Sequence, residues 1–192
     1  MIDIIAKSKI RRKIILLFLY NQKREFYLSE IAKMVGTSPG TAQRELNKLL
    51  DSDFISLKKR ANLSIYSINK RYSLLKEIEA IVRKTFGIEF QLRKELSKVE
   101  CLQYAFIFGS YVKGGFKSDS DIDLFIVGDA GEDEIMDVVQ KAEAMTGRDI
   151  DYHLVSKHEF AHRAKERFFY KDIIKDYIWL LGNEQEFKKL IK

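Results

Sequence analysis

Two short segments in the second half of the 192-residue chain carry side chains that suit chemistry at phosphorus. Gly109-Ser110 ends an apolar run, and ten residues later Asp121-Ile122-Asp123 opens another. Because residues two apart in a strand point to the same side, Asp121 and Asp123 are expected to project two carboxylates from one face. Adjacent carboxylates repel each other unless a cation lies between them, and such hard oxygen ligands favour Mg²⁺ or Mn²⁺.

The Gly109-Ser110 pair supplies the second half of such a site. A turn that leads into a helix offers free backbone N–H groups, and serine adds a hydroxyl; both suit phosphate oxygens. A phosphate cradle beside a pair of metal-binding carboxylates is an arrangement typical of displacement at phosphorus.

A third carboxylate is expected on a neighbouring strand. The segment 148–155 follows a predicted helix over 132–145 and alternates so that Asp149, Asp151 and His153 share one face. We favour Asp151 as the third carboxylate because Asp149 lies near the start of the strand. His153 is interpreted as a hydrogen-bonded residue of this polar face, with contact to substrate as the alternative.

A competing motif follows this strand. His158, Glu159 and His162 fit the His-Glu-x-x-His spacing of zinc peptidases. The extended zincin pattern needs a third histidine, which the sequence does not place after His162. The apolar stripe expected in the same helix consists of Phe160, Ala164 and Phe168. Since this stripe would turn both histidines away from the core, we favour an ordinary helix over a zinc site.

The first half of the chain is predicted to begin with three helices. The first spans about 8–21, and the second lies within 26–35 with Ser29 as its N-cap. The third begins at Ser38-Pro39, where a serine N-cap precedes a proline that needs no hydrogen-bond partner for its nitrogen.

A hairpin is predicted to follow the helices. Its strands are 54–57 and 63–68, and the turn between them carries Lys58, Lys59 and Arg60. With this order of elements, residues 10–70 resemble winged helix–turn–helix DNA-binding domains, most clearly in LSEIAKMVGTSPGTAQRELNKLLDSDFI. Asp53 departs from the family pattern, which often has glycine before the first strand of the wing.

The resemblance implies that the second helix of the pair enters the major groove and that the hairpin contacts phosphates. The residues expected to contact DNA are Thr41, Gln43, Arg44 and Lys48 in the helix and Lys58, Lys59 and Arg60 in the hairpin. Charge supports this assignment: residues 1–85 carry 18 Lys and Arg against 8 Asp and Glu, a net charge of +10, whereas residues 86–192 carry −4. A protein-docking module with a solvated basic face is the alternative.

The second half resembles the DNA polymerase β-like nucleotidyltransferase superfamily, in its minimal, antitoxin-type branch. The resemblance rests on GSYVKGGFKSDSDIDLFIV and extends to RDIDYHLVS and YIWLLGNEQEF. It implies that Asp121 and Asp123 bind two Mg²⁺ or Mn²⁺ ions and that Asp151 binds the catalytic one. The residues it implies for contact with the triphosphate are Gly109, Ser110 and Lys113, the last standing where the family often has arginine.

The implied reaction is in-line attack of a hydroxyl on the α-phosphate of a nucleoside triphosphate such as ATP, with release of pyrophosphate. Members of this branch often pair with a HEPN ribonuclease toxin, which some of them modify, so a partner protein is an expected acceptor. The alternatives are a transcriptional regulator that senses nucleotide without turnover and an antibiotic-modifying enzyme. The tail after residue 165 is short for the helical substrate domain of such antibiotic-modifying enzymes.

The predicted architecture is therefore α/β, of the α+β kind: a winged helix over 1–70, a helical connector over 71–99 and a small mixed-sheet nucleotidyltransferase domain over 100–192. The connector helices could support a homodimer. The aromatic tail, Phe168, Phe169, Tyr170, Tyr177 and Trp179, is expected to pack against the sheet or a second copy.

The same sequence predicts a cytoplasmic protein. Cys101 is the single cysteine, which favours a reducing compartment. The run Ile14–Tyr20 is far shorter than the roughly 20 residues of a membrane-spanning helix. Basic residues precede it, but no small-residue cleavage site follows, so we expect a buried helix and not a signal peptide.

Overall fold

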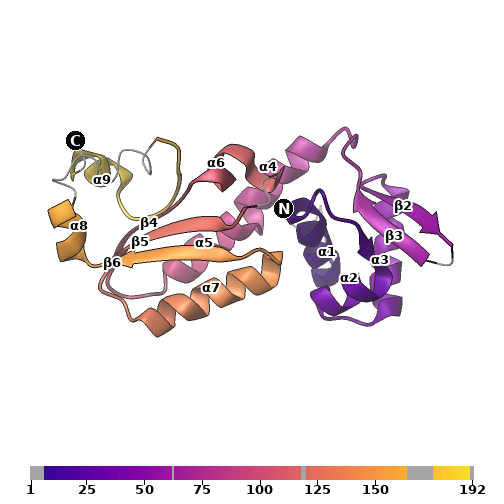
Figure 1. Cartoon of the computed structure of the whole chain (residues 1–192), viewed down its shortest axis with the longest axis horizontal. Coiled ribbons are helices and arrows are strands. Elements are labelled where there is room, and N and C mark those ends of the chain that lie inside the picture. The colour runs from indigo at the N-terminus through magenta and orange to yellow at the C-terminus, as the bar shows by residue number, and fades with distance from the viewer. Residues whose placement is uncertain (1–6, 62, 118–119, 164–174, 191–192) are drawn as a thin grey trace. The chain divides into compact units, whose positions relative to one another are not determined.

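The structure is a computed structural model that describes residues 7–61, 63–117, 120–163 and 175–190. The chain forms two compact units: Met1–Gly87 with Met145–Gly147, and Ile88–Ala144 with Arg148–Lys192. Helices combine with one small sheet in each unit, which confirms the predicted mixed α/β class (Figure 1).

Three helices build the core of the first unit: α1 (Lys9–Tyr20), α2 (Leu28–Val35) and α3 (Pro39–Asp51). The predicted starts of α1 and α3 are confirmed. The Ser8 hydroxyl accepts the Arg11 N–H at 3.2 Å, and the Ser38 hydroxyl accepts the Thr41 N–H at 3.3 Å. The run Ile14–Tyr20 is buried throughout, as expected of an interior helix.

The predicted N-cap of α2 is wrong. Ser29 lies inside the helix, which begins at Leu28 after an N-cap at Tyr27. The cause is tertiary: Phe26–Tyr27 forms β1 and pairs with β3, so extended backbone continues up to Tyr27. The Glu30 carboxylate then accepts the Tyr27 N–H at 3.4 Å.

A three-stranded antiparallel sheet with the order β1-β3-β2 completes this arrangement, with β2 over Ile55–Arg60 and β3 over Leu63–Ile68. The prediction that Lys58, Lys59 and Arg60 form the turn is therefore wrong, because all three lie in β2. Pairing runs as far as Arg60 opposite Leu63, and Ala61, directly after β2, adopts a φ of 51°. Asp53 has a φ of 58°, the left-handed region that glycine favours.

The predicted connector over 71–99 contains two helices. Helix α4 (Leu75–Thr85) belongs to the first unit and buries Val82, and α5 (Ile88–Leu96) belongs to the second and buries Leu92 and Leu96. Among the described residues, no helix is both long and apolar enough to cross a membrane.

The second unit is built on a mixed sheet with the order β6-β5-β4-β7. Strand β5 runs parallel to β6 and antiparallel to β4, which in turn is antiparallel to β7. The strands are β4 (Leu102–Phe108), β5 (Ile122–Gly128), β6 (Ile150–Val155) and β7 (Ile178–Leu181). The remaining elements are α6 (Ser110–Gly114), the short 3-10 helix η2 (Gly115–Lys117), α7 (Glu132–Thr146), α8 (Lys157–Arg163) and α9 (Glu184–Leu190).

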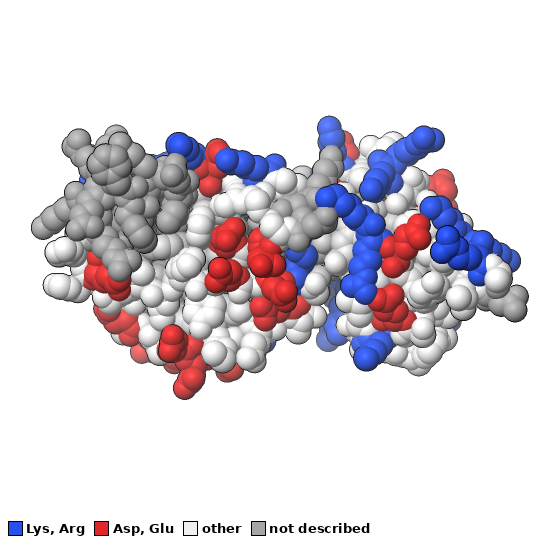
Figure 2. All heavy atoms as spheres, viewed as in Figure 1, with Lys and Arg blue, Asp and Glu red and all other residues white. Residues whose placement is uncertain are grey.

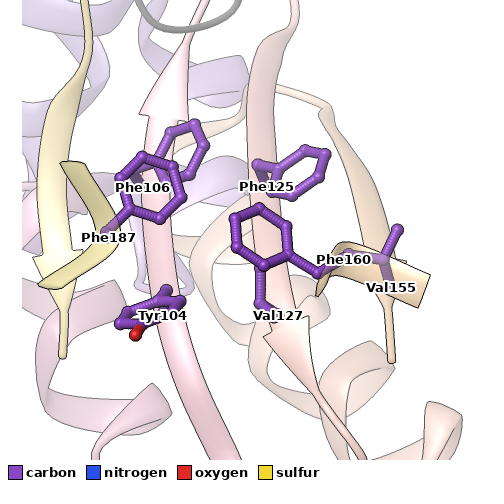
Figure 3. Close-up of a cluster of buried hydrophobic side chains, with 7 residues drawn as sticks. All are labelled: Tyr104, Phe106, Phe125, Val127, Val155, Phe160 and Phe187. Atoms are coloured by element: carbon purple, nitrogen blue, oxygen red, sulfur yellow. The ribbon is translucent and has the colours of Figure 1, made fainter. Parts of the chain in front are cut away.

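Both faces of this sheet bury apolar side chains. On one face, Phe160 of α8 and Phe187 of α9 cover an aromatic cluster of the strands (Figure 3). The strand residues of this cluster are Tyr104, Phe106, Phe125, Val127 and Val155. The residues between them point to the opposite face and are fully buried there, as Ala105, Ile107, Leu124 and Ile126 show. The centre of the sheet is therefore buried on both faces.

The expectation that the aromatic tail packs against the sheet is confirmed for Tyr177 and Trp179, which both contact the aromatic cluster. The Trp179 ring stacks on Phe106 with 5.9 Å between centroids and 10° between planes. Phe168, Phe169 and Tyr170 lie outside the described residues.

Candidate active site

The candidate site begins with a row of side chains that crosses three strands. Asp123 of β5 is in register with Asp151 of β6 on one side and with Phe108 of β4 on the other. Because side chains alternate along a strand, this row shares its face with the aromatic cluster. The pairing brings together two of the three predicted carboxylates, Asp123 and Asp151, whereas Asp149 precedes β6.

Asp121 lies one residue before β5 and two residues before Asp123. Asp121 and Asp151 are exposed, whereas Asp123 is half-buried. Burial raises the pKa of the Asp123 carboxyl above its usual value, and the negative charge of Asp151 raises it further; His153 acts in the opposite direction, and Asp121 adds to the rise. The structure thus places Asp121 and Asp151 within electrostatic reach of Asp123, where a bound cation would relieve the repulsion.

Gly109 fixes how closely the turn after β4 approaches this row. Its φ of 77° and ψ of −152° are accessible almost only to glycine, and a Cβ atom there would overlap Oδ2 of Asp123. The backbone of the turn therefore lies directly against the carboxylate. That proximity is what a site needs if one ligand is to bridge a metal ion and the turn.

Ser110 is the first residue of α6, as predicted for the phosphate cradle. Its hydroxyl forms a hydrogen bond with the Ser120 hydroxyl, in which either group can donate. This bond joins the residue that begins α6 to the residue directly before Asp121. Lys113 is exposed and lies 4.0 Å from the Asp176 carboxylate, so in this structure its partner is not an aspartate of the site.

The residues present fit a magnesium ion that is shared with substrate. In the described part of the chain, no three His, Cys, Asp or Glu side chains form a ready metal cage. Mg²⁺ typically binds to one or two carboxylates and completes its shell with water and substrate phosphates. Asp123 and Asp151 supply such a pair, and the turn at Gly109-Ser110 supplies the place for phosphates.

The competing zinc motif lies on the surface of α8. His158 and His162 are exposed, while Phe160 between them is buried in the aromatic cluster. The two histidines therefore face away from the core, as expected; Ala164 and Phe168 of the predicted stripe lie outside the described residues.

The residues expected to contact DNA divide into two groups. Arg44 and Lys48 are exposed on α3, where Arg44 donates to the Thr41 hydroxyl at 3.3 Å. Gln43 is half-buried: it accepts a hydrogen bond from the Tyr66 hydroxyl at 3.1 Å, which directs it towards the sheet of this unit. In the face viewed in Figure 2, Lys and Arg gather over the first unit and acidic patches lie over the second.

The hairpin cations are not equivalent. Lys58 forms an ion pair with Glu25 at 3.1 Å. Strand alternation places Lys58 and Arg60 on one face and Lys59 on the other. The sequence did not predict Glu25 as the partner of Lys58, because this ion pair depends on how β1, the strand directly after Glu25, packs in the sheet.

Comparison with known proteins agrees with the geometry of the second unit. Residues 91–180 match the family model of the nucleotidyltransferase domain. The matched segment contains the turn at Gly109, all three aspartates and most of strand β7. No curated protein gives a significant match to the chain.

Solved structures show more distant likeness. A toxin–antitoxin complex with AMP-PNP aligns at 21% identity over 54% of this chain and 80% of that one, with a TM-score of 0.39. The Shewanella oneidensis complex of tri-AMPylated HEPN toxin with MNT antitoxin aligns at 19% identity over 54% and 77%, with a TM-score of 0.37. Reduced HlyU from Vibrio cholerae aligns at 14% identity over 41% and 78%, with a TM-score of 0.34. The function of this chain is therefore inferred from its own residues and from the family model.

Gly109→Ala is expected to abolish binding of Mg²⁺ with nucleotide, because the added methyl group displaces the Asp123 carboxylate and the backbone resists an L-residue there. The measurement is the rise in Tm that Mg²⁺ with a non-hydrolysable ATP analogue produces. The matched control is Gly131→Ala, where the nearest atom to a new Cβ is Glu134 Cγ at 4.0 Å. An undiminished rise in the Gly109 variant would contradict the assigned geometry.

Asp123→Asn is expected to stabilise the metal-free protein at neutral pH. Since the pKa of Asp123 is raised on folding, the folded chain binds more protons than the unfolded chain between the two pKa values, and stability falls as pH rises through that interval. The variant should lose this dependence and melt about 2 °C higher at pH 7, a small shift because solvent screens a half-buried carboxylate. Melting curves from pH 4 to 8 without divalent ions measure it; a lower Tm for the variant at pH 7 contradicts the account.

Proposed function

We propose that this protein is a Mg²⁺-dependent nucleotidyltransferase that transfers a nucleoside monophosphate, AMP from ATP, to a hydroxyl acceptor. The observation that carries the proposal is the register of Asp123 with Asp151 directly against the glycine turn at Gly109, within the segment that matches the nucleotidyltransferase domain.

Each residue of the site has a role in the proposed reaction. Asp121 and Asp123 hold the metal ions, and Asp151 holds the catalytic one. When bound, these ions neutralise the triphosphate and polarise the α-phosphate. The backbone N–H groups of the turn at Gly109-Ser110 and the Ser110 hydroxyl donate to the β- and γ-phosphate oxygens.

The bond changes follow from this placement. The acceptor oxygen forms a bond to the α-phosphorus as the bond from that phosphorus to the β-phosphate bridging oxygen breaks, and pyrophosphate leaves. Asp151 is exposed and stands beside Asp123, so it is the group placed to take the proton of the attacking hydroxyl. Lys113 can reach the leaving pyrophosphate only if its ion pair with Asp176 opens.

The double variant Asp121→Ala with Asp123→Ala is expected to reduce transfer from an α-labelled nucleoside triphosphate by at least about 100-fold, since both metal ions lose the ligands from β5 and only Asp151 is left to hold the catalytic one. Acceptors to be offered include a HEPN-type partner protein, which the resemblance to the antitoxin-type branch suggests. Asp149→Ala is the matched control, because it removes an exposed carboxylate just before β6 and should leave transfer intact. Transfer that persists in the double variant would refute the site.

We also propose that the first unit is a winged helix that binds duplex DNA through α3 and the β2–β3 hairpin. Support comes from the order of its elements, its net charge of +10 over residues 1–85 and the exposure of Arg44 and Lys48. A regulator that binds nucleotide without turnover remains the second candidate function. It predicts nucleotide-dependent changes in DNA binding and no labelled product.

Replacing Lys58, Lys59 and Arg60 by Gln is expected to weaken duplex binding about tenfold or more. The slope of log K against log salt should fall in magnitude by roughly 0.9 for each phosphate that the variant no longer neutralises. Lys58 should contribute least, because Glu25 already compensates its charge. The control carries the same change in charge on the second unit, at Lys94, Lys157 and Lys189. An unchanged affinity and slope in the hairpin variant would exclude a DNA-binding role for the hairpin.

A further inference from the structure

A second row of side chains lies next to the carboxylates on the same face of the sheet. Phe106 of β4 is in register with Phe125 of β5, which is in register with His153 of β6. On each strand this row is two residues away from the row that contains Asp123 and Asp151, a displacement of about 7 Å. The carboxylate site is therefore bordered by rings.

The rings nearest the carboxylates form one continuous surface. Phe108 and His153 have centroids 6.1 Å apart, and Phe125 lies 6.3 Å from Phe108 and 6.5 Å from His153. These separations lie within the range of direct aromatic contact. We call Phe108, Phe125 and His153 the aromatic surface.

This aromatic surface is open on one side. His153 is exposed and Phe108 is half-buried, whereas Phe125 beneath them is only 2% exposed. Within the described part of the chain, the ring contacts of His153 are with Phe108 and Phe125. The sequence suggested a hydrogen-bonded histidine, but these contacts are those of an exposed ring supported by apolar neighbours.

The direction of a bound nucleotide follows from the order of the groups along the sheet. The turn at Gly109-Ser110 continues β4 beyond Phe108, and Asp123 lies in register with Asp151. In the proposed function these two aspartates lie beside the α-phosphate. A triphosphate whose outer phosphates lie at the turn must extend its ribose and base in the opposite direction. That direction leads from the carboxylate row towards His153, over a distance that a ribose can span.

We propose that the aromatic surface is the stacking site for the base of the nucleoside triphosphate, with His153 and Phe108 as its exposed rings. This inference rests on the proposed function and adds the base subsite to it. Stacking on a ring requires only the π-face of a base, so the site discriminates by overlap and not by hydrogen bonds. Purine nucleotides should therefore bind more tightly than pyrimidine nucleotides.

The test separates the base from the phosphates. We would measure binding of two Mg²⁺-loaded probes, a non-hydrolysable ATP analogue and inorganic tripolyphosphate, to the full chain and to His153→Ala and His153→Phe. His153→Ala is expected to weaken the ATP analogue about 5- to 10-fold and to leave tripolyphosphate within about twofold. His153→Phe keeps a ring and removes the basic nitrogens, so it should restore binding of the ATP analogue.

Each other result overturns the inference. An equal loss for both probes in His153→Ala, repeated in His153→Phe, would assign the histidine to charge contact with phosphate. Unchanged affinity for the ATP analogue in His153→Ala would place the base elsewhere and leave the aromatic surface to the acceptor, while the proposed function would stand. Failure of the unsubstituted chain to bind either probe would instead remove the proposed function and the base subsite together.

Discussion

The repulsion between the carboxylates of Asp123 and Asp151 is the central constraint on the candidate site of the second unit. Parallel pairing of β5 with β6 sets the two carboxylates side by side, and burial of Asp123 raises its pKa, so the arrangement is unfavourable until a cation arrives. Gly109 is part of the same constraint, because the Asp123 carboxylate lies where a Cβ atom at this position would be, so only glycine leaves room for it. The fold thus holds an unfavourable pair of charges in place, and the proposed Mg²⁺ would compensate them.

The aromatic core explains how the sheet sustains this arrangement. Phe106 packs against Phe125, Trp179 and Phe187, with ring centroids 5.3, 5.9 and 5.2 Å away, respectively. These contacts anchor β4 and β5 two residues from the carboxylates, so the register cannot slip without unpacking the cluster. The same alternation that buries these rings brings Phe108 and His153 to the edge of the site.

Sequence reasoning led to a candidate site where the spacing of residues is local, and it failed where tertiary packing decides the structure. The place of Asp149 near the start of its strand was enough to prefer Asp151, and the spacing from Gly109-Ser110 to Asp121 indicated a phosphate site. The hairpin prediction failed because strand pairing extends to Arg60, which therefore lies in β2 and not in the turn. Ala61 then adopts a left-handed conformation, which an alanine in the sequence gives no reason to expect. The contact of Phe108 with His153 depends on the register of β4, β5 and β6, which cannot be predicted from the sequence of any one strand.

The most direct test of the central claim is calorimetric binding of a non-hydrolysable ATP analogue in the presence of Mg²⁺ and again in EDTA. If the aspartates share an ion with the triphosphate, the analogue binds in Mg²⁺, and its affinity falls by at least about 100-fold in EDTA. The reason is that the carboxylates repel the phosphates when no ion lies between them. Equal affinity in EDTA would contradict the account, because nucleotide would then bind without the cation that the carboxylate pair requires.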